Sequence, residues 1–268
     1  MTTELEAIER AELEALHAAA PDALRSGLEL ACEQIGTALV SIAARLPASG
    51  IVVNRAIGLG VAGSEHPETV AAIVERYRKA GVARYFVHVH PEARPAALRQ
   101  WLVERGLEKA RGWMKFTRGR EAPPRVESAV TVRLARPDDM AAFGRIAAAA
   151  FDLGDAAAEW VAHLDRASHW RAYVSVVGGE VAGTGGLFVR DGIGWLDFGA
   201  TAPRYRGKGA QSALLRQRII DALDLGCRVI ATATGEAVPG DPQHSYKNIK
   251  RMGFREAYLR ENYAPPRT

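Results

Sequence analysis

The second half of the chain alternates short apolar runs with amphipathic stretches. Apolar residues recur at helical spacing over 210–225, and Gly226 ends that pattern. The run at 228–234 is rich in β-branched residues and predicts a buried strand, and the run at 193–201 predicts another. The other elements expected in this half are strands over 129–135, 172–177, 181–189 and 254–263, and helices over 137–151, 156–164 and 244–252.

The first half repeats this order in a less regular form. Its pattern predicts helices over 4–19, 22–34, 67–79 and 95–104, and strands over 37–44, 50–60, 83–90 and 107–116. Both halves therefore indicate an α/β fold with a mixed sheet, as in a tandem duplication in which one copy has drifted. The charged, proline-containing segment 118–128 has linker composition, so we expect domains over 1–119 and 129–268, joined by a linker over 120–128.

Composition narrows the function classes. A chain of 268 residues, 48% hydrophobic and 25% charged, suits two globular domains. The net charge of +4 is spread along the chain without a dense basic stripe, so we expect attraction to an anionic ligand and no nucleic-acid partner. Cys32 and Cys227 lack metal or redox spacing, which favours free thiols and a cytoplasmic location. An acidic start and the lack of a long apolar run predict neither a signal peptide nor a membrane span.

One glycine-rich segment carries the clearest chemistry. Residues 204–210 read R-Y-R-G-K-G-A and lie between the strand over 193–201 and the helix over 210–225. The first N–H groups of a helix have no intrahelical partner and attract anions. Gly207 and Gly209 allow the backbone to approach a phosphate closely, and the basic side chains around them add charge. This arrangement predicts a pyrophosphate site.

Other ligand motifs fit less well. The spacing of Gly207, Lys208 and Gly209 does not match a Walker loop. A dinucleotide fingerprint would need a third glycine where Ser212 stands. His88 and His90 share a strand face, but no third ligand has zinc-like spacing, so we expect no metal.

Two segments resemble a known enzyme family. T-A-P-R-Y-R-G-K-G-A-Q-S-A-L-L, over 201–215, is similar to the R-x-x-G-x-G/A signature of the GNAT acetyltransferases. S-Y-K-N-I-K-R-M-G-F, over 245–254, resembles the later helix of that family, which ends in Gly-Phe. The resemblance implies two tandem GNAT-like domains, each a mixed, mostly antiparallel twisted sheet flanked by helices. The first would be a degenerate copy that does not bind coenzyme A.

The resemblance also implies a cofactor and a reaction. Acetyl-CoA would lie with its pyrophosphate at the glycine-rich turn and its pantetheine arm between the strands over 193–201 and 228–234. The protein would transfer the acetyl group directly, in a ternary complex, to a primary amine of a small molecule or peptide. A non-catalytic acetyl-CoA sensor is the alternative. The implied cofactor-binding residues are Phe198, Gly199, Ala200, Thr201, Arg204, Arg206, Gly207, Lys208, Gly209, Ala210, Gln211, Ser245 and Asn248.

Catalysis would need a group that accepts the ammonium proton. Glu236, in the loop after the strand over 228–234, is our first candidate, and Asp197, on a strand face, is the second. His244, at the start of a helix, is a third. Many members of the family have a tyrosine as proton donor at the position of Ile249. In this chain the role of proton donor would fall to Tyr246, to Tyr258 or to solvent.

Overall fold

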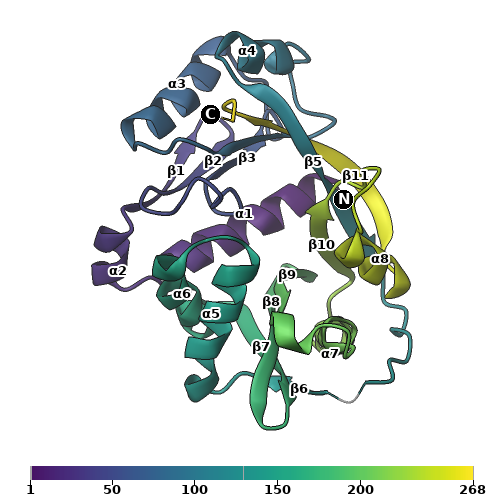
Figure 1. Cartoon of the computed structure of the whole chain (residues 1–268). Coiled ribbons are helices and arrows are strands. Elements are labelled where there is room, and N and C mark those ends of the chain that lie inside the picture. Colours follow the sequence, from purple (N-terminus) through teal and green to yellow (C-terminus); the bar gives the residue numbers. More distant parts are fainter. Residues whose placement is uncertain (1, 129, 268) are drawn as a thin grey trace. The chain divides into compact units, whose positions relative to one another are not determined.

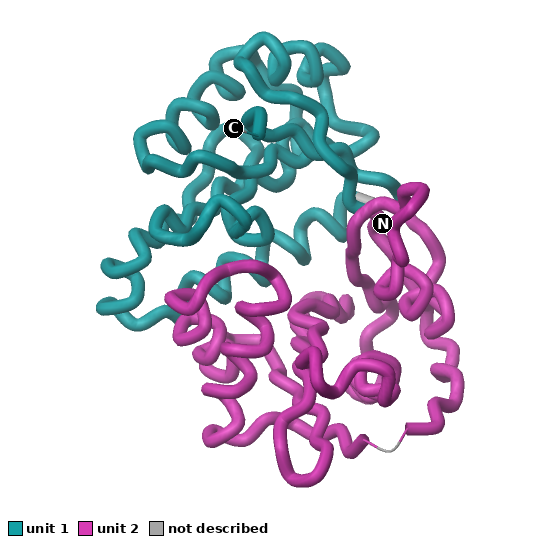
Figure 2. Tube along the Cα trace, viewed as in Figure 1, with its two compact units in different colours: residues 1–113, 258–268 teal, residues 114–257 magenta. Residues whose placement is uncertain are grey.

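The chain forms two compact units. The structure is a computed structural model that describes residues 2–128 and 130–267. Unit 1 comprises residues 1–113 and 258–268, and unit 2 comprises residues 114–257 (Figure 2). The boundaries of these compact units differ from the expected domain boundaries. Residues 120–128, the expected linker, lie in unit 2, and residues 258–268 belong to unit 1. The predicted domains stay a prediction, and Ala129, their expected boundary, lies outside the described residues.

Unit 1 is built on a mixed sheet. β2 pairs antiparallel with β1 and β3, β3 and β4 are parallel, and β11 pairs antiparallel with β4 through residues 261–263 (Figure 1). Strands β5 and β11 each begin in one unit and end in the other. The elements are α1 (Thr2–Ala18), α2 (Asp22–Gly27), β1 (Leu30–Ile35), β2 (Ala38–Ala43), β3 (Arg55–Leu59), α3 (Pro67–Lys79), β4 (Phe86–Val89), α4 (Leu98–Glu104), β5 (Glu108–Arg118) and β11 (Arg255–Ala264).

The expected helix over 22–34 is wrong in its second part. Helix α2 ends at Gly27, and Glu29 has a left-handed backbone conformation with φ of 49°. Residues 30–35 then form β1, which pairs residue by residue with β2. The backbone hydrogen bonds to β2 come from residues that are close only in the folded chain, so helical periodicity in this segment does not decide its structure.

A buried ionic cluster holds α1 against the sheet of unit 1. Arg260 is fully buried and donates hydrogen bonds to Glu6 and Glu9. Arg55 is also buried and pairs with Glu9 and Glu12. Buried charges are tolerated when they are paired in this way, so the acidic face of α1 is explained by packing within unit 1.

Unit 2 has the same type of sheet. β8 pairs antiparallel with β7 and β9, β6 pairs antiparallel with β7, and β9 and β10 are parallel. Helices α5 and α6 cover one face of the sheet and α7 covers the other (Figure 1). The elements are β6 (Thr131–Leu134), α5 (Met140–Ala150), α6 (Asp155–Ala162), β7 (Trp170–Val177), β8 (Glu180–Arg190), β9 (Ile193–Thr201), α7 (Ala210–Asp224), β10 (Val229–Gly235) and α8 (His244–Arg251).

The structure confirms the expected fold class, an α/β fold with a mixed sheet and flanking helices. In both halves of the sequence, two helices precede three antiparallel strands, which are followed by a helix, a parallel strand, a helix and a last strand; in the second half β6 comes before the two helices. The repeated order agrees with the expected duplication. Helix α7 packs on the sheet through Leu214, Leu215 and Ile219, which join Leu196 and Ile230 in one hydrophobic core. This packing fixes the first turn of α7 beside the end of β9.

Candidate active site

Strands β9 and β10 separate at the centre of unit 2. Their parallel pairing runs from Ile193 and Val229 to Leu196 and Thr232. Beyond Leu196, β9 continues to Thr201 and β10 to Gly235 with no ladder between them among the described residues. Separated parallel strands leave backbone N–H and C=O groups that an extended ligand can pair with. The expected gap between these two strands is therefore present.

A β-bulge marks the point where the strands separate. Thr184 pairs with Ala200 and Gly186 pairs with Asp197, so Phe198 and Gly199 lie opposite the single residue Gly185. Phe198 has φ of 50°, which is unusual for a residue with a side chain. The extra residue bends β9 and redirects its backbone groups, as bulges near active sites commonly do.

Arg218 lies beneath this bulge. Its side chain extends from α7, only 2% of the residue is exposed, and Nη1 donates hydrogen bonds of 3.0 Å to the carbonyls of both Gly186 and Asp197. Burial lowers the pKa of the guanidinium to about 10, so it is charged at neutral pH. Arg218 was not among the site residues predicted from the sequence. Its signal was an arginine at a core position of α7, between the buried Leu215 and Ile219.

The glycine-rich turn connects β9 to α7. Gly207 and Gly209 both have φ of 79°, a left-handed conformation that glycine adopts at little cost. Gly209 is the residue before the first helical residue, Ala210, and accepts the first intrahelical hydrogen bond from Ala213. A Cβ atom built on Gly207 would meet nothing within 4 Å. The turn therefore presents the N-terminus of a 15-residue helix with open space beside it.

The basic side chains of this turn differ in their surroundings. Arg204 pairs with Glu180 at 2.7 Å, although both side chains are largely exposed. Tyr205 also donates to Glu180, and Lys208 Nζ lies 5.4 Å from the centroid of the Tyr205 ring. Arg206 is exposed. Arg206 and Lys208 thus supply positive charge at the rim of the glycine-rich turn, while Glu180 balances part of the charge of Arg204.

Three expected cofactor-binding residues meet where α7 and α8 approach. Gln211 Nε2 donates to Ser245 Oγ at 3.3 Å, and Asn248 Nδ2 donates to Gln211 Oε1. All three are half-buried, so Asn248 is not an exposed helix residue. The contacts place the polar face of α8 beside the first turn of α7.

The candidate proton acceptors occupy different environments. Asp197 Oδ1 accepts the N–H of Phe198 at 2.6 Å, and Trp195 Nε1 donates to Asp197 Oδ2 at 3.4 Å. Lys115, fully buried, lies over the Trp195 ring with Nζ 4.2 Å from its centroid. Both carboxylate oxygens of Asp197 therefore accept hydrogen bonds from residues of β9 at the bulge. Glu236, immediately after β10, is half-buried.

The candidate proton donors are also distinct. Burial, a hydrogen bond with Glu256 and the charge of Glu236 together raise the pKa of Tyr246 to about 12. Tyr258 belongs to unit 1, where its hydroxyl donates to Glu6 at 2.7 Å. Ile249 is only 4% exposed and is part of the core of unit 2, so its side chain serves packing. His244 is exposed at the start of α8.

Unit 1 carries a carboxylate at the equivalent turn. Glu65 is 5% exposed, precedes α3 by two residues, and accepts the N–H of Thr37 at 2.6 Å. A Cβ atom on Gly36 would lie 2.6 Å from the same carboxylate. A buried negative charge before α3 opposes the binding of a pyrophosphate there.

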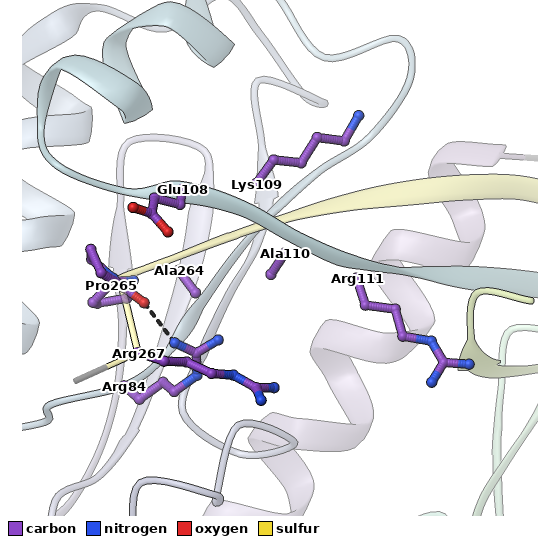
Figure 3. Close-up of a pocket in the computed structure, with 9 residues that line it drawn as sticks. Arg84, Glu108, Lys109, Ala110, Arg111, Ala264, Pro265 and Arg267 are labelled. Carbon is purple, nitrogen blue, oxygen red and sulfur yellow. Dashed lines mark hydrogen bonds between the residues drawn. The ribbon is translucent and has the colours of Figure 1, made fainter. Parts of the chain in front are cut away.

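A basic groove of about 450 Å³ lies elsewhere in unit 1 (Figure 3). Arg84 Nη1 donates to the carbonyl of Pro265 at 2.6 Å, and burial together with the charge of Arg267 lowers the pKa of Arg84. None of the expected site residues lines this groove. Among the described residues, no cluster of metal ligands is found, and no helix is long and apolar enough to span a membrane.

Comparison with known proteins agrees with this geometry. The sequence model of the acetyltransferase (GNAT) family matches residues 140–254, and no curated protein sequence matches the chain significantly. A GCN5-related N-acetyltransferase from Kribbella flavida is similar in structure, with 17% identity, a TM-score of 0.62 and coverage of 95% of this chain and 96% of that one.

Two further structures share the fold. A GCN5-related N-acetyltransferase from Sphaerobacter thermophilus has 17% identity and a TM-score of 0.56, covering 74% of this chain and 65% of its own. A tandem GNAT protein from the clavulanic acid biosynthesis pathway has 14% identity and a TM-score of 0.53, covering 80% of this chain and 76% of its own. The family match covers residues 140–254, which contain the bulge, the strand gap and the glycine-rich turn, so this segment of unit 2 belongs to the GNAT acetyltransferase family.

Proposed function

We propose that unit 2 binds acetyl-CoA and transfers its acetyl group to a primary amine of a small molecule or peptide. The observation that carries this proposal is the adjacency of the gap between β9 and β10 to the open helix N-terminus at Gly207. An extended ligand with a pyrophosphate at one end matches both features. Backbone N–H groups over 206–211 would hold the pyrophosphate, with Arg206 and Lys208 at its rim.

The residues of unit 2 divide the remaining tasks. Acetyl-CoA supplies the acetyl group as a thioester. Gln211, Ser245 and Asn248 form a polar wall beside the first turn of α7, suited to the amide-containing arm. The N–H of Phe198 is engaged by Asp197, so we assign the contact with the thioester carbonyl to the backbone N–H of Gly199.

Proton transfer needs an acceptor, for which there are two candidates, and a donor, for which there is one. Glu236 would take the proton from the ammonium form of the acceptor, because it follows β10 at the open end of the strand gap. Asp197 is the second candidate, since its carboxylate already accepts the N–H of Phe198. Tyr246 is the candidate proton donor, and its raised pKa keeps it protonated at neutral pH.

Calorimetric titration with acetyl-CoA tests the proposal. We expect one site per chain, because Glu65 opposes a second site in unit 1. Gly207→Glu should abolish binding, since it places a carboxylate at the pyrophosphate position. Gly226→Glu is a matched control at the other end of α7, with φ of 81° and equally open space. No binding by the wild-type protein would refute the proposal. Two sites per chain would refute the expectation that unit 1 does not bind acetyl-CoA.

A non-catalytic acetyl-CoA sensor is the second candidate. It is favoured by Ile249, which is buried where relatives have a tyrosine, and by the hydrogen bond that links Tyr246 to Glu256. A sensor would bind acetyl-CoA without releasing thiol in the presence of amines. Thiol release with any member of a panel of primary amines would establish the enzyme and exclude the sensor.

A further inference from the structure

Arg218 connects α7 to both strands of the bulge. Its Nε donates to the carbonyl of Leu214 at 3.1 Å, within its own helix. Its Nη1 bridges the carbonyls of Gly186 and Asp197, which are partners in the β8–β9 ladder. One planar group thus holds the base of the bulge from both sides.

Gly185 makes room for this guanidinium. A Cβ atom on Gly185 would lie 2.7 Å from Arg218 Cζ and Nε, so the guanidinium would have to move to admit any side chain there. A Cβ atom on Gly199 would lie 3.5 Å from Arg218 Nη2. The guanidinium therefore lies directly against the backbone of β8 at Gly185 and of β9 at Gly199, on the two sides of the bulge.

The placement has a cost that packing alone does not explain. Moving a charged group into the protein interior disfavours folding by several kcal/mol unless polar partners compensate for the lost water. A leucine would serve the hydrophobic face of α7 without that cost. A buried positive charge against residues 197–199 does, however, favour negative charge that develops on the other side of the same backbone.

We infer that Arg218 is a positioning residue for the acetyl group. It fixes the bulge so that the backbone N–H of Gly199 points at the thioester carbonyl, and its charge polarises that carbonyl through the intervening backbone. This inference rests on the proposed function. It predicts that Arg218 acts on the carbonyl oxygen and not on the nucleotide end of the ligand.

Two ligands that differ only at the carbonyl test the inference. S-ethyl-CoA has a methylene group in place of the carbonyl of acetyl-CoA, and it keeps the pyrophosphate and the pantetheine arm. We expect the wild-type protein to bind acetyl-CoA more tightly. Arg218→Met should lower the affinity for acetyl-CoA about tenfold and the affinity for S-ethyl-CoA less than twofold. A tenfold change is the size expected for one lost polar contact. Arg216→Met, on the same helix, should change neither affinity.

Two milder variants guard against a loss of folding. Arg218→Lys keeps the charge but loses the planar guanidinium and the Nε hydrogen bond to Leu214, so it should retain only part of the preference for acetyl-CoA. Gly185→Ala displaces the guanidinium without removing it and should reduce the same preference. Thermal unfolding shows whether each variant is folded.

The outcomes separate the two proposals. If the wild-type protein binds neither ligand, the proposed function fails. If it binds both ligands equally, or if the Arg218 and Gly185 variants weaken both by the same factor, the proposed function survives and the role of Arg218 is refuted.

Discussion

The amide of Asn248 donates a hydrogen bond to Gln211, which joins α8 to the first turn of α7. Gln211 in turn donates to Ser245, so its side chain is held from two points on α8. This relay fixes one wall of the proposed cofactor site before any ligand arrives. An orientation that is already fixed lowers the entropic cost of binding.

The relay predicts coupled effects on affinity. Asn248→Ala and Gln211→Ala should each weaken acetyl-CoA by about tenfold, because each loses its own contact and releases its partner. The double variant should be weaker than the wild type by less than the product of the two factors, since residues in one network are not additive. Calorimetric titration of the four proteins measures the coupling. Strictly multiplicative effects would show that the two side chains act independently.

The carboxylate after β10 is expected to control turnover. Glu236→Gln should lower kcat/KM for the amine about 100-fold at neutral pH, with unchanged affinity for acetyl-CoA, because it removes the proton acceptor. Steady-state kinetics and calorimetry measure the two effects. Asp224→Asn, at the exposed end of α7, is the control. If Asp197→Asn causes the larger loss and Glu236→Gln is neutral, the order of the two candidates is reversed.

The two turn glycines should respond differently to alanine. Both have φ of 79°, so either change introduces a left-handed alanine at a cost of about 1 kcal/mol. A Cβ on Gly209 would also lie 3.1 Å from Ser128 Oγ, whereas a Cβ on Gly207 meets open space. Urea unfolding should therefore show a larger loss of stability for Gly209→Ala. Equal losses would mean that Ser128 moves aside freely.

Stability should fall in mild acid because of His17. This buried histidine contacts Ser41 Oγ at 2.8 Å, and burial, followed by the charge of Arg25, lowers its pKa from 6.5 to about 4. The unfolded chain therefore binds a proton at a higher pH than the folded one. The contribution to stability is fully present above pH 6.5 and is lost as the pH falls to 4.

The expected loss is about 3 kcal/mol over that range. Urea unfolding of the wild-type protein and of His17→Gln, at several pH values, isolates this contribution from that of the carboxylates. The variant should show the smaller pH dependence. His66→Gln, which replaces an exposed histidine of unit 1, should retain the wild-type dependence. Identical slopes for His17→Gln and the wild type would contradict the assignment.

Local pattern in the sequence determined the elements that carry the proposed chemistry. Strand β9 was predicted with its observed bounds, and α7 to within one residue at its end; in unit 1, α3 was also predicted with its observed bounds. Helical periodicity and glycine punctuation are properties of neighbouring residues, so they can be read without the fold. The positive φ angles of Gly207 and Gly209 follow from the same local reasoning.

Tertiary structure decided what depends on partners distant in the chain. Residues 30–35 form a strand and not a helix because they pair with β2. Residues 258–264 belong to unit 1 because β11 pairs with β4. Arg218 stands at a core position of α7, but its partners could be recognised only when α7 was placed beneath the bulge, where Gly185 leaves space for the guanidinium. Backbone pairing between strands and the compensation of a buried charge both require groups that only folding brings together, and no local pattern in the sequence encodes them.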